Sequence, residues 1–139
     1  MEHIVKKHVR IHAPTDHVWD ALTDPEKTKK YFFNARVISS WKVGSSITFK
    51  GRMFWIIPFK MSGKIEDIEP KKILKYTLNN KDGSTSTVTD KLSFTDGWTT
   101  VEITDDVGTA EGAEKRFHRS QKGWDKVLKG LKELVEGNS

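Results

Sequence analysis

A carboxylate occupies a position where a strand would bury it. Between Ser86 and Phe94 apolar and polar residues alternate, and Asp90 shares its parity with Val88 and Leu92. If this apolar face turns toward a core, Asp90 turns inward with it. A buried carboxylate needs a donor, a cation or water, or a raised pKa that keeps it neutral. A β-bulge that turns Asp90 outward is the alternative.

The long amphipathic segment near the C-terminus carries the other groups that could do chemistry. Its later part, from Trp124 onward, is apolar, whereas its earlier part places His118 and Gln121 beside Phe117. Polar groups packed on an apolar sheet would each cost about 1–3 kcal/mol. This part of the helix therefore either borders a hollow or extends past the sheet. An Asp90–His118 pair could serve as general base and acid in a polyketide-like ring closure on a bound ligand.

Other kinds of chemistry have little support in the sequence. The five His residues show no metal-ligand spacing, the chain has no Cys, and no phosphate-binding, dinucleotide or nucleophile-elbow motif occurs. We expect neither a metal nor a cofactor. The net charge is +5, from 24 Lys and Arg against 19 Asp and Glu. Acidic residues interleave with the basic ones throughout, which argues against a nucleic-acid partner.

Length and composition indicate one domain over residues 1–139. Seven Phe, five Trp and two Tyr supply apolar surface, although only 35% of the residues are hydrophobic. No apolar run is long enough to span a membrane, and the N-terminal residues lack the apolar segment of a signal peptide. We expect a cytoplasmic monomer without a membrane span.

Hydrophobic periodicity predicts an α+β fold. Two Asp-Gly pairs between alternating runs, at residues 82–83 and 96–97, are strong hairpin signals and indicate an antiparallel meander. Residues 51–58 fit either a strand or an apolar loop. The expected elements are a strand over 4–12, helices over 15–23 and 24–33, strands over 37–38, 46–50, 59–69, 73–79, 86–95 and 98–105, and a helix over 113–136. We predict a curved antiparallel sheet of six to seven strands wrapped around the long C-terminal helix, with two short helices after the first strand.

Four segments in this order carry a resemblance to a known superfamily. They are Ala13–Glu26, Trp41–Phe49, Gly63–Pro70 continuing to Thr77, and Gly123-Trp124 followed by Leu128, Leu131 and Leu134. The chain resembles the START-related, Bet v-like helix-grip superfamily (SRPBCC), in the branch related to the activator of the heat-shock protein 90 ATPase. The resemblance implies a helix-grip fold with a cavity between sheet and helix. Asp90 departs from the pattern, because family members often carry an aromatic or aliphatic residue there.

The predicted ligand-binding residues follow from this arrangement. They are Phe33, Phe49, Met53, Trp55, Phe59, Met61, Tyr76, Asp90, Phe117, His118, Gln121 and Trp124. The first hypothesis is a protein that binds a hydrophobic small molecule, either lipid-like or aromatic. The second is an interaction module that modulates a chaperone ATPase through exposed charge, and the third is a cyclase or hydrolase acting with Asp90 and Tyr76. The ligand hypothesis requires the final helix to span the sheet without filling the space beneath it.

Overall fold

A computed structural model describes residues 3–53 and 57–137, and in these ranges one antiparallel sheet carries all seven strands. The elements are β1 (Ile4–Ile11), α1 (Thr15–Thr23), α2 (Pro25–Tyr31), β2 (Ala35–Ser39), β3 (Ser46–Met53), β4 (Ile57–Glu69), β5 (Ile73–Asn79), β6 (Thr85–Thr95), β7 (Trp98–Asp106) and α3 (Ala113–Gly137). The strand order is β1-β7-β6-β5-β4-β3-β2. The predicted α+β helix-grip class is confirmed.

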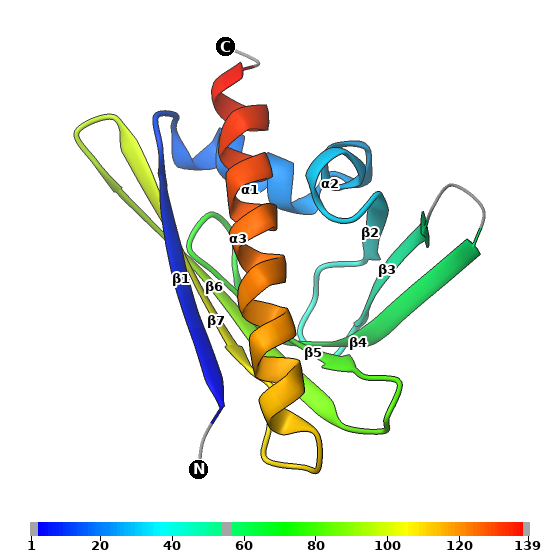
Figure 1. Cartoon of the computed structure of the whole chain (residues 1–139). Coiled ribbons are helices and arrows are strands. Elements are labelled where there is room, and N and C mark those ends of the chain that lie inside the picture. The colour runs from blue at the N-terminus through cyan, green and yellow to red at the C-terminus, as the bar shows by residue number, and fades with distance from the viewer. Residues whose placement is uncertain (1–2, 54–56, 138–139) are drawn as a thin grey trace.

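The long helix α3 lies against the concave face of the sheet. Figure 1 shows β1 on one side of α3 and the β2–β3–β4 half on the other, with α1 and α2 near its C-terminal end. One stripe of α3 is buried in the core, formed by Trp124, Val127, Leu128 and Leu131. The 25 residues of α3 give it a length of about 37 Å, enough to cross the sheet. No helix in the described ranges is long and apolar enough to cross a membrane.

A glycine allows β4 to approach β5 closely. A Cβ atom on Gly63 would lie 1.6 Å from the backbone oxygen of Thr77, so no other residue fits without moving the backbone. The pairing of β4 with β5 also shifts in register between Ile65 and Asp67. Close approaches and bulges bend a sheet. Here both features lie in β4, at the start of the half of the sheet that curves around α3.

The short helix α2 protects the edge of the sheet. Asp24 caps it by accepting a hydrogen bond from the backbone N–H of Glu26 at 2.9 Å, as the Asp-Pro pair predicts. The preceding Thr23 hydroxyl donates to the backbone oxygen of Trp19 in α1 at 2.9 Å. The buried Thr28 hydroxyl accepts from the backbone N–H of Val37 at 3.1 Å. This bond satisfies a donor on edge strand β2 that no neighbouring strand would reach.

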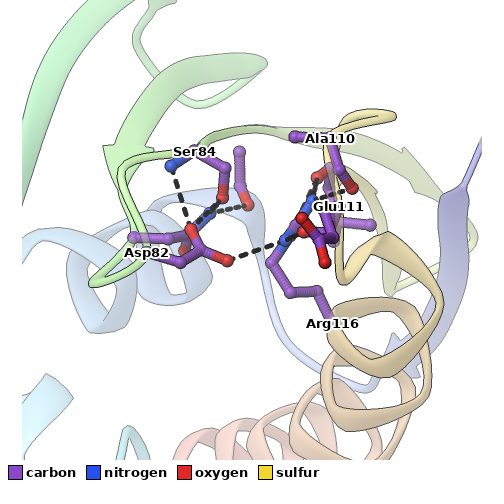
Figure 2. A network of polar contacts seen from close by, with 8 residues as sticks. Asp82, Ser84, Ala110, Glu111 and Arg116 are labelled. Carbon is purple, nitrogen blue, oxygen red and sulfur yellow. Dashed lines mark hydrogen bonds and ion pairs between the residues drawn. The ribbon is translucent and has the colours of Figure 1, made fainter.

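A buried arginine anchors the start of α3. Figure 2 shows the Arg116 guanidinium between the loop before α3 and the β5–β6 turn, where it donates to Asp82 at 2.8 Å. It also donates to the backbone oxygens of Val107, Ala110 and Glu111. A single planar group thus satisfies three carbonyls of a tight loop. We regard this network as structural, because these partners occupy the guanidinium.

Candidate ligand site beneath the C-terminal helix

A small cavity lies between α3 and the inner face of the sheet. Its volume is about 20 Å³, and its lining residues are apolar except for Thr28, Tyr31, Tyr76, Asp90 and the two tryptophans Trp41 and Trp124, which carry an indole N–H. One water molecule needs at least about 10–15 Å³, whereas ligand pockets hold about 300–1,000 Å³. The cavity therefore has room for one water and not for a lipid or an aromatic ring. The ligand hypothesis requires an unfilled space beneath α3, and in this structure side chains fill most of that space.

Aromatic side chains occupy that space. The ring of Phe32 stacks on Phe49 with centroids 4.7 Å apart and meets the edge of Trp124 at 5.9 Å. Phe49 in turn contacts Tyr76 at 5.8 Å. All four residues are buried. They form a continuous aromatic layer, which packs with favourable ring geometry and accounts for the small volume.

Asp90 carries one of three buried side-chain atoms that have no hydrogen-bond partner among the described residues; the other two are Oδ1 of Asp105 and Nδ1 of His3. It lies in β6 opposite Leu74 and Ile103, and only 4% of its surface is exposed, so the inward orientation is confirmed. Its Oδ1 atom has no hydrogen-bond partner among the described residues. Burial, and then the charge of Asp105, raise the pKa of Asp90 to about 8. At neutral pH the group is thus an uncharged carboxylic acid that can both donate and accept a hydrogen bond.

Asp105 is a second buried carboxyl, and it has a structural role. Its Oδ2 accepts hydrogen bonds from the Ser120 hydroxyl at 2.5 Å and from the Trp124 indole N–H at 3.0 Å. Burial raises the pKa of Asp105, and the two hydrogen bonds oppose that rise. Sequence reasoning missed this residue, although it continues the buried alternation of Val101 and Ile103. The contact explains why a polar Ser120 lies on the inner side of α3.

Two tyrosines, the half-buried Tyr31 and the buried Tyr76, complete the polar part of the wall. Burial, with the charge of Asp90 as the next cause, raises the pKa of both Tyr31 and Tyr76 well above the usual value of a phenol. Both phenols are therefore protonated at neutral pH and can donate a hydrogen bond. Tyr31 donates to the backbone oxygen of Ala21 at 2.7 Å. Sequence reasoning did not select Tyr31, because it is the last residue of a helix too short to carry a periodic signal.

The structure brings together only part of the predicted site. Four of the predicted residues line the cavity: Phe49, Tyr76, Asp90 and Trp124. Four others are half-buried and lie outside it: Phe59, Met61, Phe117 and Gln121. Trp55 and the side chain of Met53 lie outside the described residues.

Phe33 and His118 lie at the surface instead of in the cavity. Phe33 follows α2 with a positive φ of 48° and is 48% exposed. The side chain of His118 is 64% exposed, on the solvent side of α3 and 3.9 Å from Glu114. The suggested Asp90–His118 acid–base pair therefore does not form, because one member is buried and the other faces solvent. Within the described residues, no cluster of three or more His, Asp or Glu side chains could hold a metal ion.

A curved antiparallel sheet closed by a terminal helix, with a cavity between them, defines the helix-grip class. The family model described as "Activator of Hsp90 ATPase homolog 1-like protein" matches residues 12–136, so the chain belongs to this family. The family assignment agrees with the superfamily that the sequence resembles.

Solved structures show the same architecture. The solution structure of ChR145 from Cytophaga hutchinsonii is 30% identical, with a TM-score of 0.74 over 97% of this chain and 94% of that one. CalU16 from Micromonospora echinospora is 22% identical, with a TM-score of 0.80 over 99% of this chain and 77% of that one. The Aha1 dimer from Colwellia psychrerythraea is 19% identical, with a TM-score of 0.76 over 96% of each chain. A comparison with curated proteins gave no match.

Proposed function

We propose that this protein binds a small, mostly apolar molecule between the sheet and α3, and that Asp90 contacts the ligand's polar group. The observation that carries the proposal is the unpartnered Oδ1 of Asp90 in the wall of the cavity. A buried polar group without a partner is rare, and each instance needs a reason. Asp105 has such a reason within the fold, since it holds Ser120 and Trp124. Asp90 has none within the described residues.

The chemistry of Asp90 restricts the ligand. A neutral carboxylic acid donates through its O–H and accepts through its carbonyl oxygen, which suits a hydroxyl or an amine. The surrounding aromatic residues suit a flat or flexible apolar body. We therefore propose an apolar ligand with one hydroxyl or amine group near its buried end.

Binding requires the cavity to grow. A ligand needs about 300 Å³ or more, so the rings of Phe32, Phe49 and Trp124 must separate from their present contacts. Phe59 and Met61, which are half-buried against the same core, supply further apolar surface. Contacts between the ligand and these side chains then take the place of the contacts among the three rings.

Two experiments test this proposal. Native mass spectrometry of freshly purified protein would reveal a co-purified molecule. Thermal shift with 2-naphthol and 2-methylnaphthalene then compares two ligands of one shape that differ in the hydroxyl group. Wild-type protein should prefer the naphthol, and the Asp90→Leu variant should lose this preference while still binding the hydrocarbon. Saturating ligand, at 100 times its Kd, stabilises the folded state by about 2.7 kcal/mol. Absence of any adduct and of any shift with either compound, or an unchanged preference in the variant, would contradict the proposal.

The family match supports a second candidate, modulation of a chaperone ATPase. The family model carries the name of an activator of the Hsp90 ATPase. An activator would bind through exposed charged side chains and would not need the cavity. The ATPase rate of the chaperone from the same source, measured with and without this protein, tests the candidate directly. An unchanged rate at saturating protein rejects it, and an increase that the Asp90→Leu variant retains would separate it from ligand binding.

A further inference from the structure

A second hollow lies on the outer face of the β2–β3–β4 half, away from α3. Its volume is about 520 Å³. Arg36 and Ile38 of β2 and Lys50 of β3 are exposed and alternate with buried residues such as Val37 and Phe49, so they belong to the outer face. The lining consists of Lys29, Asn34, Arg36, Ile38, Lys50, Gly51, Arg52 and Pro58.

The strand register places basic side chains of neighbouring strands directly opposite one another at this hollow. Arg36 pairs directly with Lys50, and Lys50 pairs with Lys60, so three strands carry three positive charges in one row. Directly opposed side chains have Cβ atoms about 4.5–5.5 Å apart, and like charges at this distance destabilise a sheet. Arg52 lies two residues further along β3, and Lys29 reaches the hollow from α2. The fold gains no stability from this arrangement of charge.

One carboxylate partly compensates the cluster. Glu26 accepts a hydrogen bond from Arg36 at 2.8 Å. The Arg36 guanidinium lowers the pKa of Glu26, with smaller contributions from Lys29 and Lys30. Within the described part of the chain, Lys29, Lys50 and Arg52 form no ion pair. The hollow therefore favours negative charge, and Glu26 supplies it only beside Arg36.

The cations of the hollow differ from others on the surface in being gathered in one concave site. Lys7 pairs with Asp125 and Lys72 with Glu69, and Lys27 pairs with Asp20, whereas others such as Lys126 and Lys129 on α3 form no ion pair within the described residues. Uncompensated cations that gather in a concave site focus the electrostatic field there and attract anions. The gathering of Lys29, Lys50 and Arg52 in one hollow therefore suits an anion from outside the chain.

We propose that this hollow binds a small phosphate ester, with Lys50, Arg52 and Lys29 around the phosphate. Several cations suit a doubly charged group, and the guanidinium of Arg52 can donate two parallel hydrogen bonds to phosphate oxygens. Ile38, which is 54% exposed, and Pro58 offer an apolar surface for the organic part of the ester. The volume lies within the range of small-molecule sites. A concave site of this size favours a compact ligand over a nucleic-acid strand, which would need a longer positively charged track.

Calorimetry and amide NMR with phenyl phosphate and inorganic pyrophosphate test the proposal. The test variant is Lys50→Gln combined with Arg52→Gln. The matched control is Lys126→Gln combined with Lys129→Gln, which removes the same charge from exposed positions on α3. We expect saturable binding of one equivalent, with shifted amides on β2 and β3. The test variant should bind about tenfold more weakly or worse, because it loses charge-assisted hydrogen bonds. The control should keep its Kd within about twofold.

Three results would overturn the proposal. The first is no saturation by either compound up to about 10 mM, an affinity too weak for a site. The second is equal weakening of the test and control variants, which would show a general effect of net charge. The third is tighter binding of a mixed-sequence oligonucleotide that displaces phenyl phosphate, which would make this face a nucleic-acid surface. Circular dichroism melting of both variants checks that they fold. Relief of like-charge contacts predicts that the test variant melts no lower than the wild type.

Discussion

Replacing Asp90 by Asn tests whether this buried acid destabilises the fold as the structure requires. The pKa of Asp90 is about 8 in the folded protein against 3.8 in an exposed carboxyl. Each pH unit over which the folded protein keeps a proton that the unfolded chain has released costs about 1.4 kcal/mol. Between pH 3.8 and 7 the interval is about three units, so the destabilisation at pH 7 is roughly 4 kcal/mol. That is a large share of the 5–15 kcal/mol typical of a domain.

The pH dependence has a definite sign. Below about pH 4 both states hold the proton, and Asp90 does not lower the free energy of unfolding. From there to about pH 8 only the folded state is protonated, so the stability of the wild type falls as the pH rises. Above pH 8 both states are ionised and the difference becomes constant. Asn has a similar shape and does not titrate, so the Asp90→Asn variant lacks this decline.

Urea unfolding at a series of pH values measures the effect. The free energy of unfolding of Asp90→Asn minus that of the wild type should be smallest below about pH 4 and should rise from there by about 1.4 kcal/mol per pH unit toward pH 8. Asp67→Asn is the matched control, because Asp67 is exposed on β4. The rise with pH should be larger for Asp90→Asn than any change in the control, because Asp90 is the buried residue of the two. A difference for Asp90→Asn that stays flat, within about 0.5 kcal/mol between pH 5 and 8, would refute the reasoning.

Three further substitutions test the packing around the site. Trp124→Phe removes the indole donor to Asp105 and should lower the free energy of unfolding in urea by about 1–3 kcal/mol, whereas an unchanged midpoint would show that this bond is not needed. Arg116→Met leaves three loop carbonyls without a donor. We expect the free energy of unfolding to fall by about 3–5 kcal/mol and amide exchange in the first turn of α3 to become faster. Slow exchange there would contradict this role. Gly63→Ala should unfold the protein or lower its melting temperature strongly, because the new Cβ would overlap the Thr77 oxygen. Gly137→Ala is the control, because its Cβ meets nothing within 4 Å, and it should change the free energy of unfolding by less than about 0.5 kcal/mol. Similar melting of the two variants would count against the close approach.

The fold could be predicted from the sequence because its signals are local. Alternation in β6 and β7, and the spacing of apolar residues in α3, depend only on neighbouring positions. The Asp-Gly turns are equally local: Gly83 and Gly97 have positive φ values of 89° and 87°, as such turns require. The stretch that fitted either a strand or a loop is the one that the structure describes incompletely. Its two ends belong to β3 and β4.

The candidate site could be predicted only where it repeats the same local patterns. Parity placed Asp90 inward, and the same parity applied to the predicted strand over 98–105 places Asp105 inward with Val101 and Ile103. Phe33 and His118 were misplaced for a different reason. The direction of Phe33 depends on a left-handed turn, and that of His118 on which side of α3 faces the sheet. The cavity volume depends on how Phe32, Phe49 and Trp124 interlock, and no sequence pattern reports that.

The two buried acids differ in what they contribute to the folded state. Asp105 ties β7 to α3 through two donors, so its desolvation is offset by contacts that the folded state uses. Asp90 lies diagonally across from it on β6, with no such contact for Oδ1. A leucine at position 90 would remove the penalty of the unpaired acid, so folding alone gives no reason for an acid there. The closed aromatic layer then has a second consequence. A ligand bound as we propose would displace aromatic contacts such as the Phe32–Phe49 stack, and it would gain about 0.8 kcal/mol for each CH₂ that it buries in exchange. A molecule that is too small cannot compensate for the lost aromatic contacts, and an apolar one of the right size leaves the acid unpaired. Selectivity at this site would therefore come from size and a single polar group together.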